Sequence, residues 1–141
     1  MAFKDAYHGD TFGAMSVSDR GVFTLAFHEL LFDVIFLDRP TAENMDDLKS
    51  LVRHHGPSTA CFIYEPLVQG AGGMKTYDAG LLNELLNVMK DHEIICIADE
   101  VMTGFGRTGK LFASEYMTCK PDIICLSKGL TGGTMALGVT A

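Results

Sequence analysis

The chain has 141 residues, which suits one domain, and 48% of them are hydrophobic, which is enough for a sizeable core. Its formal net charge of −7, with acidic and basic residues interspersed, argues against a nucleic-acid-binding surface, because such a surface needs a basic stripe. The most apolar long window, 22–37, is interrupted by polar and charged residues well short of the about 20 residues of a membrane span, and no signal peptide is recognisable. We therefore expect a cytoplasmic protein with no membrane segment.

The cysteines and histidines indicate structural rather than metal-binding roles. The four cysteines form no C-x-x-C pair, and three of them lie within apolar, strand-like runs, so we expect buried, reduced thiols. The five histidines have no cysteine or histidine partners at ligand spacing, and no metal site is predicted. The cysteines are Cys61, Cys96, Cys119 and Cys125.

The first half of the chain predicts two helices and one strand. A dense polar motif, Tyr7-His8-Gly9-Asp10-Thr11, is followed by a short helix over 11–17. A strand is expected over 33–37, and Thr41 is expected to cap the next helix, which Gly56-Pro57 ends. The apolar positions of that helix recur at helical spacing at Met45, Leu48, Leu51 and Val52.

The second half alternates strands with one longer helix. A strand over 60–64 runs into Glu65-Pro66, and a glycine-rich turn over 70–73 leads to a helix over 78–92. Two strands follow, over 94–98 and 123–127. A flexible loop over 129–133 then leads to a further strand that the end of the chain interrupts, so we expect this chain to be a piece of a larger protein.

The strand pattern predicts the fold class. The strands are continuously apolar, which indicates burial on both faces, and helices of about 12 residues between strands are typical of parallel crossovers. We expect an α/β fold with a mostly parallel sheet and helices on both faces.

Asp99 and Lys128 each follow a strand-like apolar run directly. In a parallel α/β sheet, residues just past the carboxyl ends of the strands line the ligand crevice. An amine there can form a Schiff base with the aldehyde of pyridoxal phosphate, and a carboxylate can keep the ring nitrogen of this cofactor protonated. The pair therefore predicts a pyridoxal-phosphate site.

Two stretches match nucleotide-binding motifs, but the residues around them argue against a nucleotide site. Gly104 to Gly109 spells G-x-G-x-x-G, but five residues separate it from the preceding strand, and Lys128 rather than an acid lies near the later position that a dinucleotide site requires. The same stretch with Lys110 spells a phosphate loop, but Leu111 stands where a magnesium ligand should be.

The motifs together resemble the class III pyridoxal-phosphate aminotransferases, in order and spacing and over essentially the whole chain. The fold implied is part of the large domain of the fold-type I pyridoxal-phosphate-dependent transferases, with a homodimer as the complete protein. The motifs are Tyr7-His8-Gly9, Glu65-Pro66, Asp99-Glu100-Val101, Gly104 to Gly109 and Ser127-Lys128-Gly129.

The resemblance implies a role for each motif residue. Lys128 would bind the cofactor aldehyde and move the proton, Asp99 would pair with the ring nitrogen, and Tyr7 would stack on the ring. Val101 would lie on the opposite ring face, and Glu65 would support the crevice. The implied catalytic residues are Lys128, Asp99 and Tyr7; the cofactor-binding residues are Tyr7, His8, Glu65, Asp99, Val101 and Lys128; the substrate-side residues are Asp10, Arg107 and Tyr7.

Finer stretches, 6–16, 68–74 and 130–135, are similar to the biotin-synthesis branch, which transfers the amino group of S-adenosylmethionine to 8-amino-7-oxononanoate. Ala71 and Met102 stand where glutamate-dependent members carry Glu and Gln, which speaks against that branch. An ω-amino acid–pyruvate aminotransferase, a glutamate-1-semialdehyde aminomutase and a non-catalytic truncated member stay open as alternatives.

The family's phosphate-binding Gly-Ser loop, its partner-subunit threonine and its carboxyl-terminal domain are not in this sequence. We therefore expect residues 1–141 to be a central, incomplete part of the cofactor-binding domain, with no activity alone.

Overall fold

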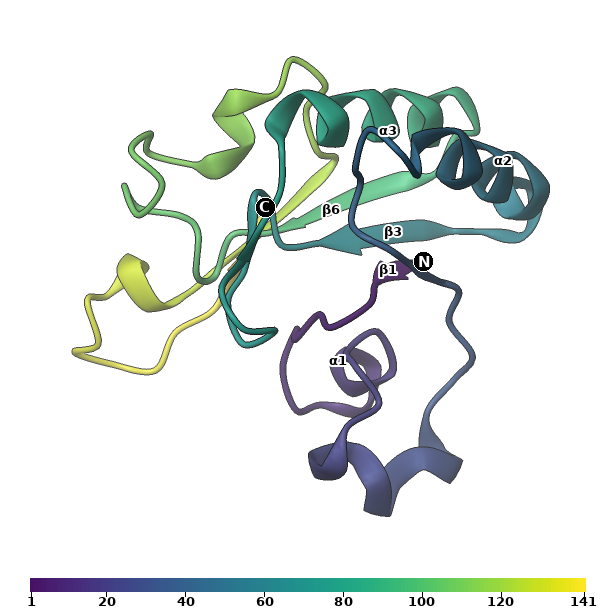
Figure 1. Ribbon diagram of the computed structural model, residues 1–141. Helices are drawn as coiled ribbons and strands as arrows, with labels where there is room; N and C mark the ends of the chain where they lie inside the picture. The colour runs from purple at the N-terminus through teal and green to yellow at the C-terminus, as the bar shows by residue number, and fades with distance from the viewer.

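A six-stranded, mostly parallel sheet forms the centre of the computed structural model (Figure 1), which describes residues 1–141 except the side chain of Phe23. The strand order is β2-β1-β3-β6-β7-β8, and only β8 runs antiparallel to its neighbour. The strands are β1 (Ala2–Phe3), β2 (Phe36–Leu37), β3 (Cys61–Tyr64), β6 (Ile95–Asp99), β7 (Ile123–Leu126) and β8 (Val139–Thr140). The predicted α/β class with a mostly parallel sheet is confirmed.

Two helices, α2 (Met45–His55) and α3 (Ala79–Asp91), pack against each other along one side of β3 and β6 (Figure 1). Asp78 caps α3, because its side-chain oxygen accepts the N–H of Leu81 at 3.0 Å. The apolar stripe of α3 is fully buried, as helical spacing requires of a core-facing helix. The core that these helices share with the sheet includes Phe3, Val52, Phe62, Tyr64, Leu82, Leu85, Leu86, Met89 and Ile94.

A smaller helical unit lies beyond β1, on the other side from α2 and α3 in Figure 1. It consists of α1 (Phe12–Ser16) and the 3-10 helix η1 (Val22–Leu30). The rings of Phe12 and Phe27 join them edge to face, with centroids 5.9 Å apart. Three shorter 3-10 helices are η2 (Gly56–Ser58), η3 (Ala113–Tyr116) and η4 (Lys128–Leu130).

Several predicted elements have different limits in the structure. Of the strand expected over 33–37, only Phe36–Leu37 pairs with a neighbour. Thr41 does not cap α2, so that expectation is wrong: Thr41 and Asn44 exchange hydrogen bonds in the preceding turn, and the helix begins at Met45. Leu51, expected on the apolar face, is 36% exposed.

The glycine-rich turn over 70–73 lies between the two strands of a short antiparallel hairpin. The sequence pattern did not predict this hairpin. Its strands are β4 (Val68–Gln69) and β5 (Lys75–Thr76). The hairpin is fixed to the rest of the chain by Gln69, whose fully buried side chain donates to the Lys4 carbonyl and accepts from Arg39, both at 2.7 Å.

All four cysteines are free thiols. Cys96 is buried in the core, whereas Cys61, Cys119 and Cys125 are half-buried, so full burial is correct for Cys96 alone. None of the helices in the described part of the chain is long and apolar enough to span a membrane.

Candidate active site

The carboxyl ends of β3, β6 and β7 deliver three ionisable residues to one edge of the sheet. β6 pairs in parallel with both neighbours, so the three strands end on the same side. Glu65 follows β3 directly, Asp99 is the last residue of β6, and Lys128 lies two positions beyond β7. This placement is the one that the strand-end argument predicts for a ligand crevice.

Asp99 is held by two hydrogen bonds. Its side chain is 9% exposed; one oxygen lies 2.7 Å from Nδ1 of His8, and the other accepts the N–H of Val101 at 3.1 Å. An ionised carboxylate can only accept, so Nδ1 carries the proton of the His8 bond. The His8 side chain is 1% exposed, and its Nε2 is buried without a hydrogen-bond partner among the described residues. His8 thus orients the Asp99 carboxylate through one of its two oxygens.

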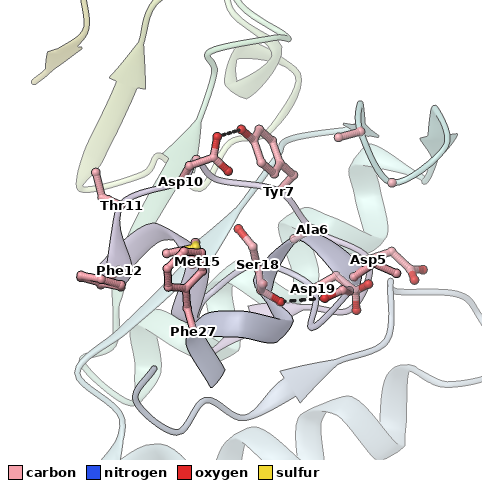
Figure 2. A pocket seen from close by; sticks show the side chains of 16 residues that line it. Asp5, Ala6, Tyr7, Asp10, Thr11, Phe12, Met15, Ser18, Asp19 and Phe27 are labelled. Carbon is pink, nitrogen blue, oxygen red and sulfur yellow. Dashed lines mark hydrogen bonds between the residues drawn. The ribbon is translucent and has the colours of Figure 1, made fainter. Parts of the chain in front are cut away.

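Tyr7 and Asp10 point toward each other in the lining of a cavity (Figure 2). The Tyr7 hydroxyl donates to Oδ2 of Asp10 at 2.9 Å. This hydrogen bond, together with partial burial, raises the pKa of the Tyr7 phenol, so the phenol keeps its proton at neutral pH. Tyr7 is 45% exposed and is therefore free to contact a ligand.

Glu65 joins the Tyr7 segment to the glycine-rich turn. Its carboxylate is almost fully buried, accepting the N–H of Tyr7 at 3.3 Å through one oxygen and the N–H of Gly70 at 2.8 Å through the other. Its carbonyl accepts the buried hydroxyl of Tyr77. Burial raises the pKa of Glu65 above its ordinary value, against the effect of both N–H donors.

The cavity next to Tyr7 has a volume of about 1210 Å³, and most of its walls are apolar. Figure 2 shows the side chains of Phe12, Met15 and Phe27 along it. Its acidic lining side chains are Asp5, Asp10 and Asp19, and no lysine, arginine or histidine belongs to the described lining. Because Lys75 and Arg39 neutralise Asp5, the uncompensated charges belong to Asp10 and Asp19. The cavity therefore favours a cationic ligand with an apolar body.

The remaining predicted site residues lie outside the described lining of the cavity. Asp99 and Lys128 are at the adjacent sheet edge, and Val101 is half-buried beside Asp99. Lys128 is exposed and has a left-handed backbone, with φ of +37°. Arg107 is exposed on the loop after β6. The structure thus brings Tyr7, His8, Asp10, Glu65 and Asp99 together and does not place Arg107 on the cavity wall.

Two residues have supporting roles that the sequence pattern did not assign. Ser18 accepts the N–H of His8 at 2.8 Å and donates to the Ala14 carbonyl at 2.8 Å, which fixes the backbone beside the His8 ring. Glu100 is fully buried, and its carboxylate accepts the hydroxyl of Thr103 and two backbone N–H groups. A carboxylate directly after the apolar β6 strand was the available signal for Glu100; no local pattern marks Ser18.

The side chains present fit the ring of pyridoxal phosphate. Asp99 is oriented on both oxygens and can accept a further bond from a ring N–H, Lys128 supplies an accessible amine, and Tyr7 supplies an exposed aromatic ring. This set of a carboxylate, an amine and an aromatic ring is the one that a pyridine aldehyde requires.

Comparisons with known proteins agree with this chemistry. The family model "Aminotransferase class-III" matches residues 1–141. The adenosylmethionine-8-amino-7-oxononanoate aminotransferase of Synechococcus elongatus is 46% identical over 150 residues, which cover 99% of this chain and 35% of the relative. The protein of the same name from Buchnera aphidicola subsp. Acyrthosiphon pisum is 40% identical, with 99% and 35% covered. The chain thus spans about a third of the length of these relatives.

Solved structures show the same fold. The adenosylmethionine-8-amino-7-oxononanoate aminotransferase of Methanocaldococcus jannaschii aligns with a TM-score of 0.90 at 40% identity, covering 99% of this chain and 33% of the other. An amine transaminase from an uncultivated Pseudomonas species, in its pyridoxal-phosphate-bound form, aligns with a TM-score of 0.90 at 36% identity, covering 99% and 35%. The predicted family and its pyridoxal-phosphate dependence are confirmed.

The burial of Glu65 predicts a pH-dependent stability. Because the folded-state pKa lies above the unfolded value, Glu65 contributes stability at pH below 4.5, and this contribution is lost as pH rises through the raised pKa. We expect the free energy of unfolding of Glu65→Gln, relative to the unaltered chain, to rise with pH over this window. Urea unfolding at a series of pH values measures the difference.

Asp5→Asn is the matched control. Lys75 lowers the pKa of Asp5, so the stability that Asp5 contributes is present above pH 3.8 and is lost only as pH falls below it. The effect of Asp5→Asn should therefore be constant above pH 4.5. A pH-independent effect of Glu65→Gln as well would contradict the assignment.

Proposed function

Because this chain belongs to the class III aminotransferases, we propose that it is the central part of the cofactor domain of a biotin-synthesis aminotransferase. The complete enzyme passes the amino group of S-adenosylmethionine to 8-amino-7-oxononanoate and gives 7,8-diaminononanoate. The observation that carries the proposal is the doubly hydrogen-bonded Asp99 at the end of β6, with Lys128 beyond the next strand.

Asp99 and its partners would fix the ring of the cofactor. Asp99 would accept the N–H of the pyridine ring, and its bonds to His8 and Val101 keep it from turning away. Tyr7 would stack on the ring, and Val101 would pack against it. Glu65, through its bond to the Tyr7 N–H, sets the height of the Tyr7 ring above the edge of the sheet.

Lys128 would hold the cofactor and, once released, would move the proton. When bound, the protonated pyridine ring supplies an electron sink for the bonds at the substrate α-carbon. The amino group of the donor would displace the Lys128 amine from the cofactor aldehyde carbon, and the freed amine would then take a proton from the α-carbon and return it to that cofactor carbon, a role that suits an exposed amine just past a strand. The same side chain would serve in the opposite direction with the keto acid.

The charge of the cavity supports S-adenosylmethionine as the amino donor. S-adenosylmethionine carries a sulfonium and an ammonium group against one carboxylate, so its net charge is positive, which matches the uncompensated carboxylates of Asp10 and Asp19. A dicarboxylate such as glutamate would meet like charge there. Ala71, which lines the cavity, likewise offers no carboxylate to mask a substrate-binding arginine.

A second candidate is an amine or ω-amino acid aminotransferase. The 36% identity to the amine transaminase favours keeping it, since an amine donor is also cationic. The two functions differ in the donor: S-adenosylmethionine in the first, and an ω-amino acid or simple amine in the second.

We also propose that the complete enzyme is a homodimer in the cytoplasm. The 3-10 helix η1 exposes Val22, Leu25 and Leu30, with Phe32 beyond it, and such a cluster favours a subunit contact. The four free cysteines fit a reducing compartment.

Asp99→Asn should reduce the kcat of the complete enzyme by two or more orders of magnitude, which corresponds to about 3 kcal/mol of transition-state stabilisation. The amide cannot keep the ring nitrogen protonated, whereas the other contacts to the cofactor persist, so the cofactor Kd should change much less. Stopped-flow rates and a cofactor titration measure both.

Asp122→Asn is the matched control, because Asp122 lies at the opposite end of β7 and binds Lys90 and the Cys96 N–H. It should affect stability rather than kcat. Near-normal turnover of Asp99→Asn would show that Asp99 is misassigned.

A donor assay tests the proposed reaction. The complete enzyme should transfer an amino group from S-adenosylmethionine to 8-amino-7-oxononanoate at a kcat/KM at least tenfold above that with alanine, glutamate or an ω-amino acid. The 141-residue chain alone should be inactive, because it spans about a third of its relatives and their remaining parts would close the pocket. A faster reaction with an ω-amino acid would favour the second candidate, and turnover of the chain within tenfold of the complete enzyme would refute its dependence on further segments.

A further inference from the structure

Two bulky residues, Phe105 and Lys128, have left-handed backbones. Phe105 lies against Gly129, the residue that follows Lys128. Phe105 has φ of +60° and Lys128 has φ of +37°. Side chains of this size rarely adopt such a conformation, and it persists only where the surroundings enforce it. Between them, Gly129 packs against the ring and the Cβ of Phe105.

The contact is close enough to exclude any side chain at position 129. A Cβ atom added to Gly129 would lie 2.8 Å from both Cβ and Cδ2 of Phe105, and 3.0 Å from Cγ. The Cβ of Phe105 is attached to its backbone and cannot swing aside as the end of a long side chain can. Phe105 therefore rests directly on the backbone of the residue that follows Lys128.

The loop that carries Phe105 is fastened at both ends by Glu100. The Glu100 carbonyl accepts the N–H of Gly104 at 2.9 Å, one residue before Phe105. Its carboxylate accepts the N–H groups of Ala113 at 2.9 Å and Ser114 at 2.7 Å, where the loop ends. Glu100 is fully buried, so these bonds are shielded from water.

Phe112 completes the connection. Its ring packs edge to face on the ring of Phe105, with centroids 5.6 Å apart and an interplanar angle of 68°. The Phe112 ring also lies 3.4 Å from the position of a Cβ on Gly104. Glu100 thus holds Ala113, the neighbour of Phe112, and contacts continue from Phe112 through Phe105 to Gly129.

We propose that Phe105 is a positioning residue that holds Lys128 in its left-handed conformation by pressing on Gly129. The inference rests on the proposed function in one respect, namely that Lys128 is the lysine that binds the cofactor. The direction of the Lys128 side chain follows from its backbone, so the loop after β6 sets the approach of the amine to the cofactor. Loss of the ring would let residue 128 relax to the right-handed region.

Selective isotope labelling of lysine tests the proposal without the cofactor. The chain has seven lysines, so ¹³C- and ¹⁵N-labelled lysine gives seven sets of backbone signals, and Lys128→Arg identifies the one from Lys128. In Phe105→Ala, the Cα and Cβ shifts of Lys128 should leave the left-handed range. Those of Lys4, Lys49 and Lys90, on other elements, should stay in place.

Three further variants separate this role from general stability. Phe105→Leu keeps an apolar side chain against Gly129 and should restore the Lys128 shifts. Leu111→Ala removes an exposed side chain of the same loop and should leave them unchanged. Gly129→Ala should lower Tm alone, but the loss should be smaller when Phe105→Gly is also present, because this change removes both the ring and the Cβ that clash with position 129.

The complete enzyme provides the functional measurement. Phe105→Ala should lower kcat at least tenfold with KM within twofold, and Phe105→Leu should recover most of the loss. Unchanged Lys128 shifts in Phe105→Ala, or additive Tm losses in the double variant, would overturn the proposal. If the shifts move as expected but Lys128→Arg retains full transaminase activity, the positioning stands and the proposed function fails.

Discussion

The parallel pairing of β3, β6 and β7 is the constraint on which the candidate site depends. Since these strands run in the same direction, the residues that follow them reach the same edge of the sheet, although Glu65, Asp99 and Lys128 are far apart in the sequence. The register leaves Asp99 as the last paired residue of β6, opposite Cys125. A carboxylate and an amine are thereby brought to one edge by backbone hydrogen bonds.

Three buried carboxylates lie at this edge of the sheet, and each is compensated by a different set of hydrogen-bond donors. A buried carboxylate is costly unless hydrogen bonds replace its lost water. Glu100 accepts three bonds and fastens a loop, while Glu65 accepts two N–H groups and joins Tyr7 to the glycine-rich turn. Asp99 also accepts two bonds, from His8 and Val101, and it is the last residue of β6, beside the strand after which Lys128 follows. We propose that this position, rather than the number of bonds, makes Asp99 the carboxylate that receives a ring N–H.

Much of this arrangement could be predicted from the sequence, because the patterns that indicate it lie within short segments of the chain. Apolar runs before Asp99 and Lys128 marked the ends of two strands, and the helix expected over 78–92 corresponds to α3. The start of α2 was harder to predict. The side chains of both Thr41 and Asn44 can accept a backbone N–H, so the sequence alone does not show at which residue the helix begins.

The contacts that complete the site were not predictable from local pattern. His8 and Asp99 are 91 positions apart, so their bond depends on the assembled sheet. The β4–β5 hairpin has strands of two residues, too short for any alternation to appear. The contact between Phe105 and Gly129 likewise depends on how Glu100 folds the loop back, which neither the glycine spacing nor the apolar pattern specifies.

The most direct test of the account is to locate the covalent attachment of the cofactor. The chain is incubated with excess pyridoxal phosphate, reduced with borohydride and mapped by peptide mass spectrometry. The account predicts that the pyridoxyl group is found on Lys128, the lysine just past the end of β7. Labelling spread evenly over the other lysines would contradict it; these are Lys4, Lys49, Lys75, Lys90, Lys110 and Lys120.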